Sequence, residues 1–418
     1  MSSRQSVANV WRDHELPAAI LASATLVGLV VAGASLLVDP LLVVRPGDAP
    51  KYFQIARAPF DATDVPSAPF RYRVVTPTLA WLLPTSRLTG FAVVNLSALT
   101  AAGVVGYAYL RDLGFGVRRA AFGLALFVVS PAVAYLSTNL VLVDGVTMFM
   151  LACVFWAAYR DRLLVFALLL ALGVATKESV LFALPIYGLY CLQRRGVRGV
   201  VRPIAAAIPA GVMYLGLRVF YGFSGDTLGA IVARGVGAQL DKFAMSVFYI
   251  PYEVYSAFGT LWVLAALVRG RHAPKVVRER SVDRRTAFLA AGIAVVPLAF
   301  LQPLIARNIT RVLFIAFPVV IPTALLGIES LSRRLRLAFC GFAALAGLAG
   351  IAGALVVLPS LAGSVESVSL PAIQYLALVG AANELVVILA VLAGGSADTG
   401  AGEPSAPPLR TESRSRAD

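Results

Sequence analysis

The strongest constraint on this chain is a series of apolar segments, long enough to form membrane-spanning helices, that recurs along its whole length. A hydrocarbon core of about 30 Å needs about 20 apolar residues in a helix, which places about twelve spans. They lie near residues 17–42, 88–110, 120–137, 140–159, 163–176, 178–192, 203–221, 250–268, 286–306, 312–331, 337–358 and 371–392. Only 14% of the residues are charged, whereas soluble domains carry about 25%. The pattern predicts an all-α polytopic membrane protein.

The distribution of basic residues predicts the orientation of these spans. With the N-terminus in the cytoplasm, most of the 36 lysines and arginines lie in cytoplasmic loops, as the positive-inside bias requires. We therefore expect both termini to be cytoplasmic. Residues 1–392 then form the transmembrane domain. Residues 393–418, rich in Gly, Ser, Pro and charge, are expected to form a disordered cytoplasmic tail.

The composition also argues against several classes of function. The net charge is +14, but the basic residues are spread over short loops and are not interleaved with aromatic residues. No nucleic-acid partner is therefore expected. The three cysteines lie in apolar stretches, which is typical of small core residues. The two histidines fall in predicted cytoplasmic loops, so a metal site built from His and Cys is not expected.

The longest hydrophilic segment is the predicted first external loop, residues 45–87. Its first part, GDAPKYFQIAR (47–57), predicts a short helix with Asp48 as N-cap and Pro50 in the first turn. The apolar positions of this helix recur at helical spacing and are expected to lie on the membrane surface. They are Tyr52, Ile55, Ala56 and Pro59.

A second amphipathic helix is predicted over Pro69–Pro84, with Arg71 and Arg73 at its start. Two such helices in a first external loop are the main organisational feature of the chain. The predicted loop Gly222–Tyr249 is the second longest external segment, and its position makes it a candidate acceptor-binding loop.

Further charged residues are predicted at the same outer surface. Asp144 lies where the span near 140–159 begins, and Arg311 precedes the span near 312–331. Lys177 and Glu178 form a polar step between two short spans. Glu384 differs from these because it lies inside the last span, where an ionised group is costly, and the sequence does not indicate its partner.

Each of these residues also has a simpler structural interpretation. The two aspartates could cap helices, and Lys177 with Glu178 could form an ion pair that closes a turn. The arginines could anchor the chain at lipid headgroups, and Tyr52 could be an interfacial aromatic residue.

Four stretches, taken in order, resemble the GT-C superfamily of membrane glycosyltransferases, which includes protein O-mannosyltransferases and aminoarabinose transferases. GDAPKYFQIAR (47–57) resembles the acidic motif of the first loop, although many members have a second acid where this chain has Ala49. NLVLVDGVTMFMLACVFW (139–156) resembles the second acidic motif. GVATKESVLFALP (173–185) and ARNITRVLFIAFPVVIP (306–322) resemble later segments. The resemblance covers roughly residues 15–330.

This resemblance implies a GT-C-like bundle that transfers a sugar, with inversion, from a polyprenyl-phosphate carrier to a hydroxyl acceptor on the non-cytoplasmic face. Asp48 and Asp144 are then the candidate catalytic acids, because attack by a hydroxyl requires a base. Candidate phosphate-binding residues are Arg71, Arg73, Lys177 and Arg311, since fixed cations stabilise a leaving phosphate. Tyr52 and Glu178 are further candidate contacts. No cofactor is expected, and the alternative is a divalent cation bound by Asp48 and Asp144.

Two other classes of membrane protein remain as alternatives. A twelve-span secondary transporter fits the number of spans and the cytoplasmic termini. Such carriers usually show related halves, and the commonest have a long central cytoplasmic loop. Here the central loop, residues 193–202, is short and the two halves show no repeat. A polysaccharide polymerase or ligase would share the chemistry, but such proteins carry their large external loop late in the chain.

Overall fold

The computed structural model describes residues 14–37, 48–223, 228–245, 249–276, 283–302, 309–357 and 370–393. Within these residues the chain is all-helical and contains no strand. Residues 1–13 and 394–418, on which the predictions for the two termini and the tail rest, lie outside the described residues.

Most of the described helices coincide with the predicted apolar segments, and α4 (Ala49–Arg57), α5 (Val75–Leu82) and α13 (Leu228–Met245) lie outside them. The long ones are α2 (Leu16–Leu37), α6 (Arg87–Asp112), α12 (Val201–Tyr221), α19 (Arg333–Val357) and α20 (Leu370–Ala393). Shorter ones are α9 (Asp144–Tyr159), α10 (Leu163–Thr176), α11 (Ala183–Arg195) and α16 (Arg284–Ala299). The segment near 312–331 is formed by α17 (Ile309–Leu313), the 3-10 turn η6 (Phe314–Ala316) and α18 (Phe317–Ser330).

Two predicted spans are each a pair of helices that meet at a bend. Helices α7 (Val117–Val128) and α8 (Pro131–Thr138) meet at 46°. Ser130 accepts a hydrogen bond from the Val133 N–H and so caps the second helix of this pair. Helices α14 (Tyr249–Phe258) and α15 (Leu261–Val276) are bent by 73°.

Fewer of the described helices are long and apolar enough to span a membrane than the twelve spans that the sequence predicts. Six helical stretches among the described residues are long and apolar enough to cross a membrane, or up to eight if each bent pair is one span. Helices α9 and α10 have only 16 and 14 residues, which is short for a hydrocarbon core of about 30 Å. An all-helical membrane protein is therefore supported, while the count of about twelve is not confirmed.

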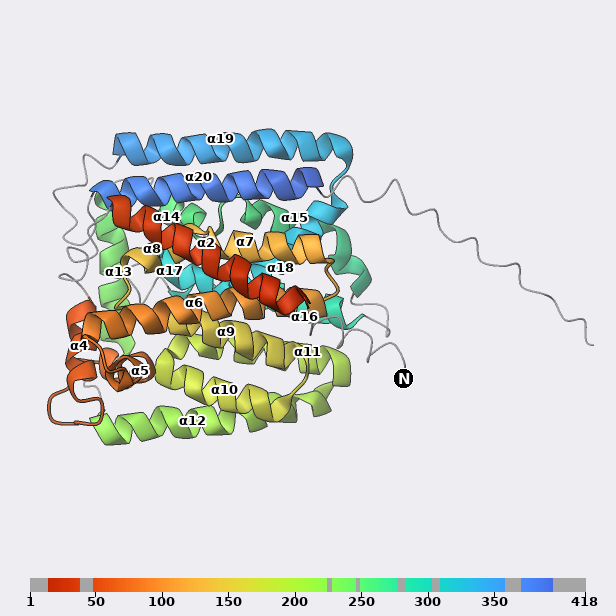
Figure 1. Ribbon diagram of the computed structural model, residues 1–418. Coiled ribbons are helices and arrows are strands. Elements are labelled where there is room, and N and C mark those ends of the chain that lie inside the picture. Colours follow the sequence, from red (N-terminus) through yellow and green to blue (C-terminus); the bar gives the residue numbers. More distant parts are fainter. Residues whose placement is uncertain are drawn as a thin grey trace, which may run out of the picture.

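Most helices run side by side along one direction, and α13 (Leu228–Met245) runs across one end of the bundle (Figure 1). The described part of the predicted external segment Gly222–Tyr249 is thus mostly helical, and its role in binding an acceptor stays a prediction. Helices α4 (Ala49–Arg57) and α5 (Val75–Leu82) lie at the same end as α13. The start of α2 and the end of α20 lie together at the opposite end (Figure 1).

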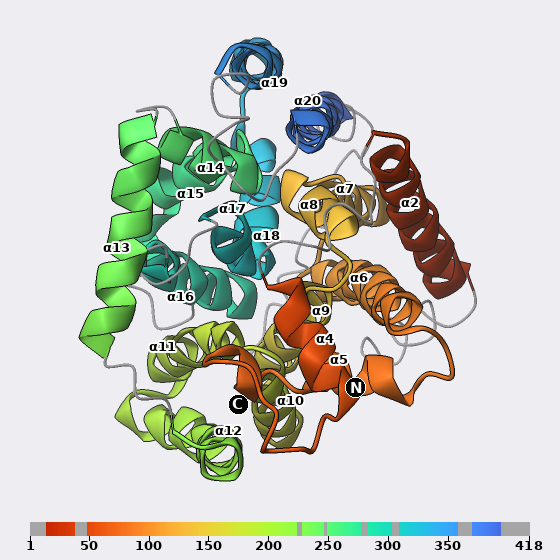
Figure 2. The same cartoon turned by 90° about the vertical axis from the view of Figure 1, so that its left-hand side faces the viewer.

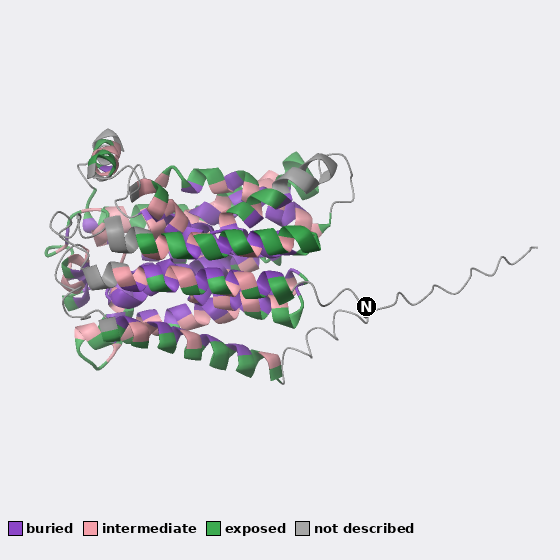
Figure 3. Ribbon diagram, turned by 90° about the horizontal axis from the view of Figure 1, so that it is seen from above, coloured by how far each residue is buried: buried purple, intermediate pink, exposed green. Residues whose placement is uncertain are grey.

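Burial follows the pattern expected of a protein surrounded by lipid. Buried residues concentrate in the middle of the bundle, and the outer faces of the peripheral helices are exposed (Figure 3). These exposed faces are apolar, as on α12, where they carry Ile204, Ile208, Val212, Leu215 and Val219. Apolar surface of this extent is unfavourable in water but suits the interior of a bilayer.

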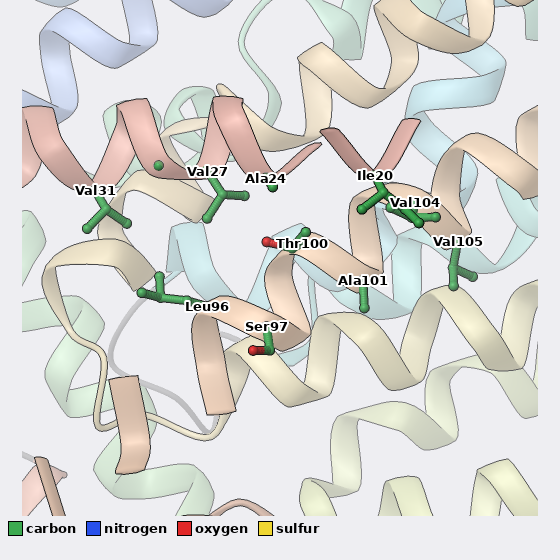
Figure 4. A pocket seen from close by; sticks show the side chains of 11 residues that line it. Ile20, Ala24, Val27, Val31, Leu96, Ser97, Thr100, Ala101, Val104 and Val105 are labelled. Carbon is green, nitrogen blue, oxygen red and sulfur yellow. The ribbon is translucent and has the colours of Figure 1, made fainter. Parts of the chain in front are cut away.

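A groove of about 610 Å³ lies between α2 and α6 (Figure 4). Its lining is mostly aliphatic and includes Ile20, Val31, Leu96 and Val105, with Ser97 and Thr100 as the polar members. None of the charged residues singled out by the sequence lies in this lining. A lining of this kind suits the hydrocarbon chains of surrounding lipid.

Candidate functional site

Helix α4 covers the end of the bundle instead of lying on the membrane surface. Its apolar stripe is buried against the protein, with Tyr52 1% and Ala56 0% exposed. Tyr52 packs edge-on against Phe70, and Phe53 packs edge-on against Phe91 of α6. The expectation of a surface-lying stripe was therefore wrong, because the stripe is buried and Tyr52 packs against Phe70 of the same loop. Figure 2 views this end of the molecule, with α4 and α5 in front of α9 and α10.

Asp48 occupies the predicted N-cap position of α4, but its side chain makes no capping hydrogen bond. Its carboxylate instead lies 3.5 Å from the guanidinium of Arg311. The side chain of Asp48 keeps 27% of its surface exposed. The side chain of Asp48 is therefore placed by Arg311 and not by a capping hydrogen bond. Its partial exposure leaves the carboxylate accessible to a substrate.

The predicted second helix of the first loop is present in two pieces. A 3-10 turn, η2 (Phe70–Tyr72), precedes α5, and Arg73 lies in the link between them. The backbone N–H of Val74 donates to the carbonyl of Ala175 at the end of α10, at 2.9 Å. This bond ties the first loop to the polar step that follows α10.

Arg73 is held by two partners on opposite sides of that junction. Its guanidinium donates to the Tyr52 hydroxyl at 3.2 Å and to the Glu178 carboxylate at 3.2 Å. Burial raises the pKa of Tyr52 to about 12, with Asp144 and Asp48 adding to the effect and Arg73 opposing it. Tyr52 therefore stays a neutral hydroxyl over the physiological range.

The aromatic ring of Phe70 lies beside these groups and was missed by the sequence analysis. The ammonium of Lys51 lies 3.8 Å from the ring centroid, and the Arg73 guanidinium 5.5 Å. Cations are attracted to aromatic faces at these distances. The only available signal was the position of Phe70 next to Arg71 in the sequence, which is too weak to predict the contact.

Asp144 is the first residue of α9, and the N-cap position is taken by Val143. The Asp144 carboxylate is 2% exposed and accepts from the Lys177 ammonium at 2.5 Å and from Arg311 at 3.3 Å. Lys177 itself is buried, with 6% of its side chain exposed. The carboxylate thus forms a buried ion-pair network, and the interpretation as a plain helix cap does not describe it.

The environment of Asp144 is set by a close approach of α6. A Cβ on Gly145 would lie 2.5 Å from the Asn95 side-chain oxygen. The Asn95 amide donates to the carbonyls of Phe91 and Leu140 and is therefore fixed in place. Only glycine allows α9 to begin this close to α6. This second contact was also missed, because neither residue carries a charge.

Arg311 connects the two aspartates. One terminal nitrogen lies 3.5 Å from Asp48, and the other lies 3.3 Å from Asp144. These three residues come from the first loop, the start of α9 and the helix α17, which are far apart in the sequence. The fork geometry of a guanidinium suits such a bridge between two carboxylates.

The cluster thus unites seven of the eight residues that the sequence analysis selected. Its acids are Asp48, Asp144 and Glu178, its cations are Arg73, Lys177 and Arg311, and Tyr52 joins them. The formal charges of the acids and the cations cancel. Because Lys177 pairs with Asp144 and Glu178 pairs with Arg73, the alternative of a local Lys177–Glu178 pair does not describe the arrangement.

Arg71 is the selected residue that makes its contacts elsewhere. Its guanidinium donates to the carbonyl oxygens of Pro66 and Tyr221, both at 3.1 Å. These bonds fasten the first loop to the end of α12. The position supports a role for Arg71 in holding the loop.

Among the described residues, no three His, Cys, Asp or Glu side chains lie close enough to hold a metal ion. Between Asp48 and Asp144 the bridging group is Arg311. A divalent cation bound by both carboxylates would have to displace this guanidinium.

No family model, curated protein or solved structure matches this chain. The interpretation of the cluster therefore rests on its own geometry and chemistry.

Proposed function

We propose that this protein is a membrane glycosyltransferase that moves a sugar from a polyprenyl-phosphate carrier to a hydroxyl acceptor, with inversion at the anomeric carbon. The observation that carries the proposal is the bridge formed by Arg311 between Asp48 and Asp144 at the end of a membrane bundle. A base and phosphate-binding cations are thereby brought together, which this reaction requires.

Asp48 is the base in this proposal. It is the more exposed of the two aspartates, and among the described residues its cationic partner is Arg311 at 3.5 Å. Asp144 is almost fully buried and is held by two cationic partners, Lys177 and Arg311. We therefore assign Asp144 the role of positioning Lys177 and Arg311.

The cations stabilise the leaving group. A carrier phosphate that bridges sugar and lipid has one negative charge, and it gains a second when the bond to the sugar breaks. Arg311 and Arg73 keep 15% and 14% of their side chains exposed, so both can be reached by such a phosphate. Fixed cations aimed at developing charge are an effective source of catalysis in a site shielded from water.

The proposed groups account for every bond formed, every bond broken and the proton that is transferred. Asp48 takes the proton of the acceptor hydroxyl, and the hydroxyl oxygen forms a bond to the anomeric carbon opposite the phosphate. The bond from that carbon to the phosphate oxygen breaks, and its electron pair leaves with the polyprenyl phosphate. Because attack and departure occur on opposite sides, the anomeric configuration inverts.

The proposal includes the finer expectations about the fold. These are a GT-C-like bundle of about twelve spans, with α9, α10, α11 and α16 as short spans. Both termini are then cytoplasmic, and the cluster faces the non-cytoplasmic side. The donor and the acceptor are proposed partners of this site.

The proposal is tested by transfer from a labelled polyprenyl-phosphate sugar to a crude acceptor fraction, with purified protein in liposomes. We expect Asp48→Asn to reduce transfer by about 100-fold or more, as loss of a general base does. The matched control is Asp64→Asn, because Asp64 is an exposed acid of the same loop that contacts Gln54. Equal transfer by wild type and Asp48→Asn would remove Asp48 from the mechanism.

A second comparison addresses the phosphate. Arg311→Lys should impair use of the donor, because an ammonium cannot reproduce the two-pronged contact. Arg57→Gln, at the exposed end of α4, is the control for a cation outside the cluster. Transfer measured with and without a chelator tests the alternative of a divalent cation between Asp48 and Asp144.

Secondary transport is a second candidate, and the broken helix pair α14–α15 favours it. Broken membrane helices and buried acids often form ion sites in transporters, and the 73° bend lies beside buried Glu384. Uptake by proteoliposomes under an imposed ion gradient tests this function. Robust uptake, with no transfer of sugar, would replace the transferase proposal.

A further inference from the structure

Glu384 is a buried carboxylate within α20, outside the cluster described above. It is 1% exposed and lies in a helix that is long and apolar enough to span a membrane. A charged group in this position is costly unless it is fully hydrogen-bonded. Its contacts therefore indicate what it does.

Among the described residues, Glu384 accepts hydrogen bonds from Thr260, at the break between α14 and α15, and from Tyr255, in the last turns of α14. The backbone N–H of Thr260 donates at 2.9 Å, the Thr260 hydroxyl at 2.5 Å and the Tyr255 hydroxyl at 3.0 Å. Gly259 has a φ of +54°, and a Cβ there would lie 2.1 Å from the carboxylate. The carboxylate thus occupies the break and satisfies an N–H at the start of α15.

The same break lies against the segment that carries Arg311. Phe258, the last residue of α14, stacks on Phe314 with ring centroids 5.1 Å apart. Phe314 begins η6 and follows Arg311 by three residues, which is one turn of helix. The end of α14, at the break, therefore packs directly against η6, the turn that follows Arg311.

A second contact from α14 holds the other end of α17. The Glu253 carboxylate accepts from the backbone N–H of Ile309 at 3.4 Å, and the Glu253 carbonyl accepts from the Thr310 hydroxyl at 2.9 Å. Helix α17 has only five residues, so few bonds within it fix its position. Its placement depends on α14.

We propose that Glu384 is a positioning residue, which fixes the α14–α15 break and, through α14, the helix that places Arg311 between Asp48 and Asp144. This positioning of α17 by Glu384 does not depend on which reaction the cluster performs. The consequence for catalysis rests on the function proposed above. The described contacts of Glu384 are with Thr260 and Tyr255, so it acts on the distant cluster through packing.

The test is hydrogen–deuterium exchange of the purified full-length protein in detergent, read on peptides that cover residues 309–316. Glu384→Leu removes all three hydrogen bonds, and we expect exchange in α17 and η6 to become about 10-fold faster or more. Peptides that cover α9 and α10 should keep the wild-type rate. Glu384→Gln, which retains an acceptor for the Thr260 N–H, should restore most of the protection.

Control variants separate positioning from general loss of stability. Glu329→Gln removes an acid from the exposed pair with Arg119 and should leave α17 unchanged. Glu253→Gln, which weakens the second contact, should raise exchange in α17 while the bend is intact. If Glu384→Leu does not fold, Tyr255→Phe removes one hydrogen bond only and should give a smaller increase at the same peptides.

The transfer assay gives the catalytic readout. We expect Glu384→Leu to raise the KM for the donor by several-fold more than it changes kcat, and Glu384→Gln to stay close to wild type. Unchanged exchange at α17, or a uniform increase through the whole bundle, would overturn the positioning role. If the wild type transfers no sugar while Glu384→Leu shows faster exchange at α17, the positioning role stands and the proposed function is refuted.

Discussion

The ion pair between Lys177 and Asp144 gives the most direct quantitative test of the cluster. Lys177→Met replaces the ammonium by an apolar group of similar length, in a pair whose side chains are 6% and 2% exposed. Removing one partner of a buried pair costs about 3–5 kcal/mol, because the other charge is left uncompensated. Arg311 still lies 3.3 Å from Asp144, so we expect the lower end, about 3 kcal/mol.

The reverse substitution should cost more. Asp144→Asn leaves Lys177 without its anionic partner and removes one of the two carboxylates beside Arg311, so we expect about 4–5 kcal/mol. The double variant removes one charge of each sign and restores the balance of the cluster. It should be milder than Asp144→Asn alone, with a coupling free energy of at least about 2 kcal/mol.

The free energies are measured by titrating the protein in mixed micelles with a denaturing detergent and following circular dichroism. Arg119→Met is the matched control, because Arg119 forms an ion pair with Glu329 at 2.7 Å with side chains 39% and 31% exposed. Exposed pairs contribute at most about 1 kcal/mol. The reasoning is refuted if Lys177→Met costs no more than Arg119→Met, or if the double variant costs the sum of the two single ones.

Two further predictions concern the neighbourhood of the cluster. Because the pKa of Tyr52 is raised to about 12 in the folded protein from an ordinary value of 10.0, its contribution to stability is full below pH 10 and is lost between about pH 10 and 12. Unfolding of wild type compared with Tyr52→Phe over that range should show the extra loss in wild type, and parallel curves would contradict it. Gly145→Ala places a methyl group 2.5 Å from the fixed Asn95 oxygen and should destabilise the protein by about 1–3 kcal/mol. Gly106→Ala in α6, with nothing within 4 Å of the added carbon, should not destabilise the protein by the same measurement, and equal effects would contradict the close approach.

Local and periodic features could be predicted from the sequence because they depend on near neighbours. The apolar segments give the helices, since backbone groups in lipid must bond within their own segment. Asp48 and Pro50 correctly predict that α4 begins at Ala49 with Asp48 at the N-cap position, because a cap and a proline act within one turn. The selection of charged residues depended on their types, on their predicted side of the membrane and on the four stretches that resemble the GT-C superfamily.

The identity of each partner was decided by the tertiary structure. The sequence gives no reason for Lys177 to pair with Asp144 when Glu178 is its neighbour. Arg71 and Arg73 are indistinguishable in the sequence, yet only Arg73 meets Tyr52 and Glu178.

The breaks in the helices were likewise decided by the tertiary structure. The bend at Gly259 and the partner of Glu384 arise from the packing of α20 against α14 and α15. Hydrophobic periodicity specifies which face of a helix is buried, but not which helix covers it. Electrostatic pairing depends on distances of a few ångströms between segments that are far apart in the chain. For this reason the composition and spacing of residues determine the helices and the candidate charges, and only the folded arrangement determines which charges meet.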